Sequence, residues 1–317
     1  MFWIIVCLIA GTLMLYFGSE WLVRGAKGLA LRLGVAPFVI GLTVLAFGSS
    51  APECITSIVS SDTPDIIIGN VVGSNIANIG LAIGLAAIVG PMAAKYKDMR
   101  MEICVMLLAE AGLCLISILG YIGWFEGIIM MLLLFVFLFL VFKNKSSDKE
   151  GQEAYVEEVT EDTLSSPILV ALVIIGLVLL YFGAKYFIAG AKDLAVEMGV
   201  SDMLIGLIVV AIGTSLPEIC ISLIAARRGE ADLAVANIVG SNIFNAFFVL
   251  GIGASLVNIP VSEPTLYFHM PIMIGLSLLM FLMVWRSNRI TRIYGALLLT
   301  VYIVYIVTMA LVPSLTI

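Results

Sequence analysis

The sequence is poor in charge, since Asp, Glu, Lys and Arg make up only 12% of its 317 residues, against about 25% in a typical soluble protein. It also has one histidine and five cysteines, with no two cysteines closely spaced. These absences argue against a zinc-type cluster or a disulfide framework. The net charge of −6 argues against a nucleic-acid partner. What is abundant is apolar side chain, at 62% of the residues, which predicts a chain embedded in a lipid bilayer.

Long apolar runs recur along the whole chain. A helix needs about 20 apolar residues to cross a bilayer. The sequence predicts an all-α membrane protein with ten transmembrane helices, at approximately 2–24, 36–60, 65–90, 101–120, 123–142, 167–189, 203–226, 232–257, 267–285 and 291–313.

One polar stretch divides these helices into two groups. Residues 143–166 read KNKSSDKEGQEAYVEEVTEDTLSS, a composition typical of a solvated acidic linker. The sequence therefore predicts a first five-helix repeat at 1–142 and a second at 167–317.

The basic residues predict the orientation. With the N-terminus outside, alternate loops take all the Lys and Arg residues except Lys185 and Lys192. Positive charge favours the cytoplasmic side of a membrane. We therefore expect a multi-pass protein of the cell membrane with both termini outside and the 143–166 linker in the cytoplasm.

The two halves share an internal repeat. Residues 16–53 and 181–218 are related by a constant offset of 165, and 69–84 and 236–251 by an offset of 167. The first pair of segments keeps Pro and Glu at fixed positions, and the second keeps Gly, Ser and Asn. Apolar composition alone does not explain this. Because each half has an odd number of predicted helices, the second copy is expected to enter the membrane from the opposite side. Inverted repeats of this kind are an architecture of secondary transporters, with the site near mid-membrane.

The first repeated motif carries a carboxylate into each apolar half. It reads GSSAPE at 48–53 and GTSLPE at 213–218. A carboxylate within a membrane costs at least a few kcal/mol, so it is expected to face a partner or a cavity. No basic residue lies in either helix core, and the natural counter-charge of Glu53 and Glu218 is a bound cation.

The prolines of this motif are expected to free backbone carbonyls. Pro52 and Pro217 have no N–H, so each helix is predicted to kink or unwind at its Gly–Ser or Gly–Thr step. Carbonyls near Ala46, Gly48 and Ser49, and near Ala211, Gly213 and Thr214, could then face an ion. The hydroxyls of Ser49 and Ser50 share a helix face with Glu53, and those of Thr214 and Ser215 share one with Glu218.

The second motif, GSNIAN at 73–78 and GSNIFN at 240–245, adds further oxygen ligands. Ser74 and Asn78 lie on one helix face, as do Ser241 and Asn245. Asn75 and Asn242 are instead expected to bond to neighbouring helices. Glu110 has no acidic counterpart in the second half and is read as a packing or water-facing group. An all-oxygen ligand set with two carboxylates is suited to hard cations such as Ca²⁺ or Na⁺.

With these motifs the chain resembles the cation/calcium exchanger superfamily, and its prokaryotic-type sodium/calcium exchangers in particular. The resemblance implies antiport of Na⁺ against Ca²⁺ by alternating access, with the first and sixth helices sliding against the other eight. It implies central ligation by Glu53 and Glu218 with the carbonyls of Ser49 and Thr214, completed by Asn78 and Asn245. Flanking sodium sites would be lined by the hydroxyls of Ser50, Ser215, Ser74 and Ser241 and the carbonyls of Ala46 and Ala211.

Several alternatives remain open at this point. A Ca²⁺/H⁺ antiporter is the principal one, although the histidine found in the motifs of many proton-coupled relatives is absent here. Asn at both 78 and 245 makes coupled K⁺ transport less expected. An intramembrane hydrolase or a passive channel would also place acids in helices. The expectation is a non-enzymatic antiporter without a cofactor, functional as a monomer, whose partners are Ca²⁺, Na⁺ and the lipid bilayer.

Overall fold

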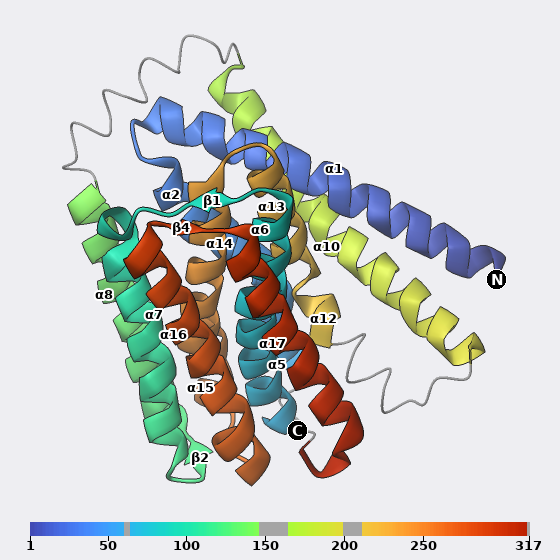
Figure 1. Ribbon diagram of the computed structural model, residues 1–317, viewed down its shortest axis with the longest axis vertical. Helices are drawn as coiled ribbons and strands as arrows, with labels where there is room; N and C mark the ends of the chain where they lie inside the picture. Colours follow the sequence, from blue (N-terminus) through green and yellow to red (C-terminus); the bar gives the residue numbers. More distant parts are fainter. Residues whose placement is uncertain (60–63, 146–163, 199–210, 316–317) are drawn as a thin grey trace.

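The protein is a bundle of helices in which two oblique helices cross one side of a more upright group (Figure 1). The computed structural model describes residues 1–59, 64–145, 164–198 and 211–315. Within them, seven helical stretches are long and apolar enough to cross a membrane, which makes the chain a multi-pass membrane protein. They are Phe2–Leu33, Pro64–Val89, Trp124–Lys143, Ser166–Glu197, Ala231–Leu256, Thr265–Ser287 and Arg292–Leu311.

The two oblique helices are α1 (Phe2–Leu33) and α10 (Ser166–Glu197), each of 32 residues. At 1.5 Å per residue each is about 48 Å long, which exceeds the bilayer core of about 30 Å and agrees with their tilt in Figure 1. The predicted spans 2–24 and 167–189 ended too early, because the helices continue beyond their apolar parts.

Glycines bring α1 and α10 into close contact. A Cβ on Gly176 would lie 2.8 Å from the Gly18 carbonyl oxygen, and one on Gly11 would lie 2.6 Å from the Phe187 nitrogen. Neither position has room for a larger side chain without a backbone shift. The two helices therefore pack backbone against backbone, as small residues allow in membranes.

Two interrupted helices form the most buried layer of the bundle. The first consists of α5 (Pro64–Ala77), the π-helical segment η3 (Asn78–Ile83) and α6 (Gly84–Val89). The second consists of α14 (Ala231–Phe244), the π-helical segment η5 (Asn245–Val249) and α15 (Leu250–Leu256). Around them stand α7 (Tyr96–Ser117), α8 (Trp124–Lys145), α16 (Met270–Ser287, preceded by η6 at Thr265–His269) and α17 (Arg292–Leu311, followed by η7 at Pro313–Leu315).

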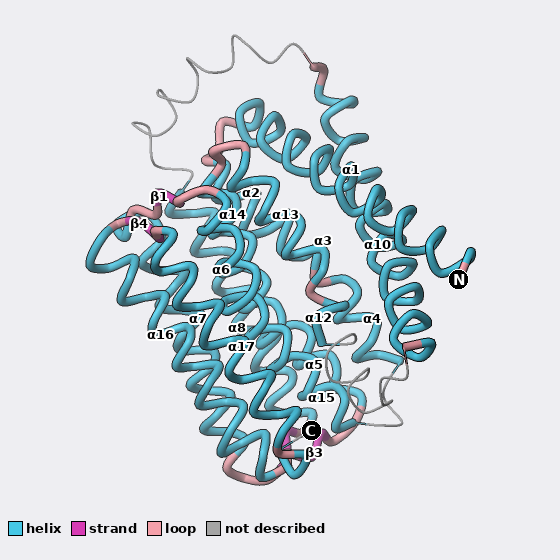
Figure 2. The backbone as a smooth tube through the Cα atoms, turned by 45° about the vertical axis from the view of Figure 1, so that its right-hand side comes forward, coloured by secondary structure: helices cyan, strands magenta, loops and turns pink. Residues whose placement is uncertain are grey.

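Two short antiparallel sheets join loops at opposite ends of the bundle (Figures 1 and 2). Strand β1 (Met92–Ala93) pairs with β4 (Arg289–Ile290), with Met92 opposite Ile290. Strand β2 (Tyr121–Ile122) pairs with β3 (Ile259–Pro260), with Tyr121 opposite Pro260. Each sheet ties a loop of the first half of the chain to a loop of the second half.

Two further helices are broken in the middle. In the first half, α2 (Pro37–Ile40), the π-helical η1 (Gly41–Leu45) and α3 (Ala46–Ser49) are followed by a break at Ser50 and then by α4 (Ala51–Val59). In the second half, α12 (Ala211–Thr214) is followed by a break at Ser215 and then by α13 (Leu216–Arg227).

The broken helices agree with the predicted interruption beside the prolines. The backbone leaves the helical conformation at Ser50 (φ −82°, ψ 7°) and at Ser215 (φ −86°, ψ 4°). Pro52 and Pro217 fall in the first turn of the helix that follows, where a missing N–H costs nothing. Most of the predicted 143–166 linker, namely 146–163, and residues 203–210 of the predicted seventh span lie outside the described residues.

Candidate functional site

Two carboxylates lie at the first turns of the helices that follow the breaks. Glu53 lies in the first turn of α4 and Glu218 in the first turn of α13, and both are completely buried. A hydrogen bond from Ser50, three residues before Glu53 in the chain, reaches Glu218 Oε1. The repeats thus bring one acid from each half of the chain to a common place inside the protein.

Hydroxyl groups surround these carboxylates from both halves. The Ser50 hydroxyl donates to Glu218 Oε1 at 3.3 Å, and the Ser74 hydroxyl donates to Glu53 Oε1 at 3.5 Å. Ser74 also lies 3.4 Å from the Thr214 hydroxyl.

The matching pair in the other half of the site is Ser49 and Ser241, whose hydroxyl oxygens are 3.3 Å apart. The repeat offsets relate Ser49 to Thr214 and Ser74 to Ser241. The two hydroxyl pairs are therefore equivalent by the internal repeat.

Four asparagines form a reciprocal network beside the acids. Asn75 Nδ2 donates to the Asn242 carbonyl at 3.2 Å, and Asn242 Nδ2 donates to the Asn75 carbonyl at 3.3 Å. Asn78 Nδ2 donates to Asn242 Oδ1 at 3.0 Å, and Asn245 Nδ2 donates to Asn75 Oδ1 at 3.1 Å. The expectation that Asn75 and Asn242 bond to neighbouring helices is confirmed.

The network leaves buried acceptor oxygens without a donor. Among the described residues, Glu53 Oε2, Glu218 Oε2, Asn78 Oδ1 and Asn245 Oδ1 have no hydrogen-bond partner, and neither does the Ser215 hydroxyl. Leaving a buried polar atom unsatisfied costs about 1–3 kcal/mol. Four acceptors gathered in one place are the arrangement that a bound cation would satisfy.

The ligand chemistry is that of a hard cation. Within the described parts of the chain, no three His, Cys, Asp or Glu side chains are gathered so that they could hold a metal ion. Carboxylate, amide and hydroxyl oxygens are the donors available here, and Ca²⁺ and Na⁺ prefer such oxygens to nitrogen or sulfur.

The backbone carbonyls of the site differ in whether they already accept a hydrogen bond. Ala46 O accepts the Ser50 N–H at 3.0 Å and the Ser49 hydroxyl at 3.3 Å, so the expected freeing of this carbonyl is not seen. Pro52 has no N–H to donate, so the carbonyl that loses its helical donor is that of Gly48, four residues earlier. Ala211 is the first residue of α12, and its side chain lies outside the described part of the structure.

The structure brings together most of the residues singled out from the sequence and adds others. Asn237 Oδ1 accepts the Ser49 hydroxyl at 3.4 Å, and Asn70 Nδ2 donates to the Glu53 carbonyl at 3.4 Å. The repeat offset relates Asn70 to Asn237, and this shared position was the signal that could have identified them. Each π-helical segment in the central layer begins at a site asparagine, Asn78 or Asn245. Single π turns are frequent at functional sites.

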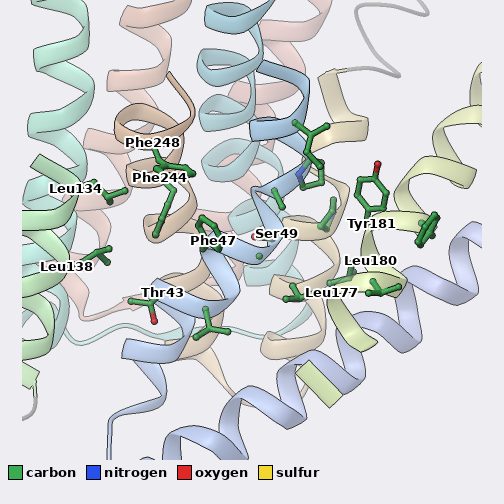
Figure 3. Close-up of a pocket in the computed structure, with 18 of the residues that line it drawn as sticks. Thr43, Phe47, Ser49, Leu134, Leu138, Leu177, Leu180, Tyr181, Phe244 and Phe248 are labelled. Atoms are coloured by element: carbon green, nitrogen blue, oxygen red, sulfur yellow. The ribbon is translucent and has the colours of Figure 1, made fainter. Parts of the chain in front are cut away.

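An apolar cavity of about 790 Å³ lies beside α3, between α8 and α10 (Figure 3). Phe47, Leu134, Leu177 and Phe248 contribute to its wall, and Ser49 stands at its inner edge. A wall of carbon atoms offers no ligand to a cation. The candidate cation site is therefore the polar cluster around Glu53 and Glu218, which this cavity meets only at Ser49.

Known proteins resemble this chain along nearly its whole length. A family model described as "Sodium/calcium exchanger protein" matches residues 3–143 and 168–311. The uncharacterized membrane protein MJ0091 of Methanocaldococcus jannaschii is 36% identical over 301 residues, which cover 94% of this chain and 95% of that protein. The sodium/calcium exchanger MaX1 of Methanosarcina acetivorans is 32% identical over 341 residues, which cover 95% of this chain and 97% of that protein. A solved structure of the sodium-calcium exchanger NCX_Mj, soaked with 100 mM Na⁺ and 10 mM Sr²⁺, superposes with a TM-score of 0.85 at 35% identity and covers 97% of this chain and 98% of that one.

Proposed function

Because this chain belongs to the sodium/calcium exchanger protein family, we propose that it is a secondary antiporter that exchanges Na⁺ for Ca²⁺ across the cell membrane. Its family is one of transporters and not of enzymes. Ca²⁺ and Na⁺ are the transported substrates, and the exchanger needs no resident cofactor.

The unpartnered oxygens of Glu53, Glu218, Asn78 and Asn245 are the observation that carries this proposal. Two carboxylates carry two negative charges, which one Ca²⁺ or two Na⁺ would balance. An empty site would leave two like charges buried at close range, a costly state in an apolar interior. The protein therefore favours movement with one load or the other over movement empty, which is the basis of exchange.

The two hydroxyl pairs supply positions for Na⁺ on either side of the centre. Ser74, which donates to Glu53, lies beside Thr214, and the equivalent pair in the other half is Ser49 with Ser241. Ser50 donates to Glu218, and the Ser215 hydroxyl is available to an ion. The carbonyls of Ser49, Thr214, Ala46 and Ala211 complete the proposed ligand set, with Ala46 released when its two donors turn away.

The two halves, 1–142 and 167–317, are inverted repeats in a ten-helix arrangement joined by the 143–166 linker. The repeat offset of 167 relates β1 to β3, and these strands belong to sheets at opposite ends of the bundle (Figures 1 and 2). Equivalent loops on opposite sides support inversion. The site then lies near mid-membrane, between the repeats.

Basic residues define the cytoplasmic side. Lys95 follows β1, and Arg289 lies in its partner β4. A Cβ on Gly90 would lie 2.7 Å from the Ala226 carbonyl, so the turn after α13, with Arg227 and Arg228, is at the same end. Positive charge favours the cytoplasm. Both termini are then outside and the linker is inside.

Alternating access requires that the site open to each side in turn. The oblique pair α1 and α10 is the part that shifts against the remaining helices, since it packs on them mainly along one side (Figure 2). One chain contains both halves of the site, so a monomer is sufficient for transport.

A flux assay tests the proposal. Proteoliposomes loaded with Na⁺ are diluted into Na⁺-free buffer, and uptake of radioactive Ca²⁺ is followed. Uptake driven by the outward Na⁺ gradient is expected. Uptake that ignores Na⁺ and follows a pH gradient would contradict Na⁺ coupling and identify a Ca²⁺/H⁺ antiporter. Ion currents far faster than carrier turnover would identify a channel.

A further inference from the structure

A third carboxylate, Glu110, is buried beside the site and takes no part in the transport proposed above. It lies in α7 and is completely buried, which agrees with the packing interpretation and not with the water-facing one. Its Oε1 atom accepts two hydrogen bonds, from Asn242 Nδ2 at 3.3 Å and from the Ser277 hydroxyl at 3.0 Å. Glu110 therefore touches the asparagine network and not the ion ligands themselves.

Through Asn242, this contact reaches a proposed ligand. One N–H of the Asn242 amide is directed to the Asn75 carbonyl and the other to Glu110. With both N–H groups fixed, Asn242 Oδ1 can face only one way, and it accepts Asn78 Nδ2 at 3.0 Å. That bond in turn fixes the Asn78 amide and so the direction of Asn78 Oδ1, which has no donor in the described structure.

The second half lacks an equivalent support. The repeat offset of 167 relates Glu110 to Ser277, so a serine takes the place of the acid there. Asn75, which orients Asn245, donates from Nδ2 to the Asn242 carbonyl, and no second acceptor for this amide occurs among the described residues. The two amide ligands are thus held by unequal networks, and Asn78 has the additional anchor.

We propose that Glu110 is a positioning residue for cation binding, which fixes Asn78 through Asn242 by accepting a hydrogen bond and thereby makes the two amide ligands of the site unequal. The inference rests on the proposed cation site. The role proposed for Glu110 depends on its acceptor oxygen and not on its negative charge. An isosteric amide at position 110 would still offer that oxygen to Asn242 and Ser277, whereas an apolar side chain would not.

The test is Ca²⁺ binding to detergent-purified protein by isothermal titration. The substitutions are made in the wild-type protein, in Asn78→Ala and in Asn245→Ala. In the wild-type background, Glu110→Leu is expected to weaken Ca²⁺ binding about fivefold, the effect of one hydrogen bond of about 1 kcal/mol. Glu110→Gln is expected to restore most of that loss. Ser277→Ala, which removes the other donor to Oε1, should weaken binding less than Glu110→Leu does.

The backgrounds Asn78→Ala and Asn245→Ala separate positioning from a general structural role. Glu110→Leu should add little to Asn78→Ala, because the ligand that it positions is already gone, and should add its full effect to Asn245→Ala. Equal additional losses in both backgrounds would overturn the proposal, and so would a Glu110→Gln variant as weak as Glu110→Leu. Absence of Ca²⁺ binding by the wild-type protein would contradict the proposed function itself.

Discussion

The side chains of Asn75 and Asn242 donate to each other's backbone carbonyls, at 3.2 and 3.3 Å, where the two buried interrupted helices cross. Each of these asparagines also presents its side-chain oxygen to the amide of the site asparagine from the opposite half. The pair is thus both an interhelical bond and the support of two proposed ligands. This arrangement and the two buried acids lead to three predictions, and an ion pair outside the site leads to a fourth.

The carboxylates of Glu53 and Glu218 are expected to be individually essential for transport. Glu53→Gln and Glu218→Gln each remove one of two negative charges from the site while keeping its shape. Because the loss of one member of a buried charged interaction costs about 2–5 kcal/mol, Ca²⁺ uptake at limiting Ca²⁺ should fall by about a hundredfold or more. Proteoliposome flux measures the effect, and size-exclusion chromatography reports folding.

The matched control for these variants is Glu263→Gln, which neutralises an exposed acid outside the site. It is expected to transport as the wild-type protein does. Retained Na⁺-driven uptake in both Glu53→Gln and Glu218→Gln would remove the proposed cation site.

Replacement of Asn242 should destabilise the bundle as well as the site. Asn242→Ala removes three hydrogen bonds that cross between helices. At about 0.6 kcal/mol for each interhelical hydrogen bond in a membrane protein, the free energy of unfolding is expected to fall by about 2 kcal/mol. Thermal unfolding in detergent checks this result. Thr300→Ala, which removes a hydroxyl bonded within its own exposed helical turn, is the control and should change little. An equal shift in the two variants would contradict a special role of Asn242.

An acid at position 245 should make stability depend on pH. Asn245 Nδ2 donates to Asn75 Oδ1 at 3.1 Å, and an ionised Asp would instead bring two acceptors together. A protonated Asp can still donate. The stability of Asn245→Asp is therefore expected to approach that of the wild-type protein at acid pH and to fall below it as the pH rises. Melting temperatures of both proteins across the pH range measure this difference, and a constant difference would refute the expected donor role.

An ion pair joins the oblique helix α1 to the start of the second central helix. Lys27 Nζ lies 2.7 Å from Glu230 Oε1, and both side chains are partly exposed. Such a pair contributes about 1 kcal/mol or less. Lys27→Glu or Glu230→Lys alone should lower the melting temperature slightly, and the double exchange should recover part of the loss. If the double variant is no better than the worse single variant, the pair does not hold α1 in solution.

Much of the site was predictable because the repeat duplicates it. The Pro-Glu step predicts a helix break next to a carboxylate, and the breaks at Ser50 and Ser215 occur beside the two acids. The separation of Ser74 and Asn78 by four residues predicts that both belong to one face. That these faces meet across the two halves required the structure, since sequence spacing fixes neighbours along one helix and not between helices.

Other features lay beyond the reach of periodicity. The length of α1 exceeds its apolar run, because a helix can continue past the apolar segment when polar partners such as Glu230 receive its charged residues. The support that Glu110 gives to Asn242 depends on how α7 packs against α14, a tertiary contact with no local pattern. The Ala46 carbonyl is occupied by the Ser50 N–H, and its second bond depends on the rotamer of Ser49.

The two small sheets have a mechanical consequence. The pairs β1–β4 and β2–β3 join loops from both halves at the two ends of the bundle. The outer helices that these loops connect are therefore held in fixed positions relative to one another. The glycine-lined contact between α1 and α10 joins those two helices into one rigid pair. In the proposed transport cycle, α1 and α10 are then expected to move together against a stiff frame formed by the other helices.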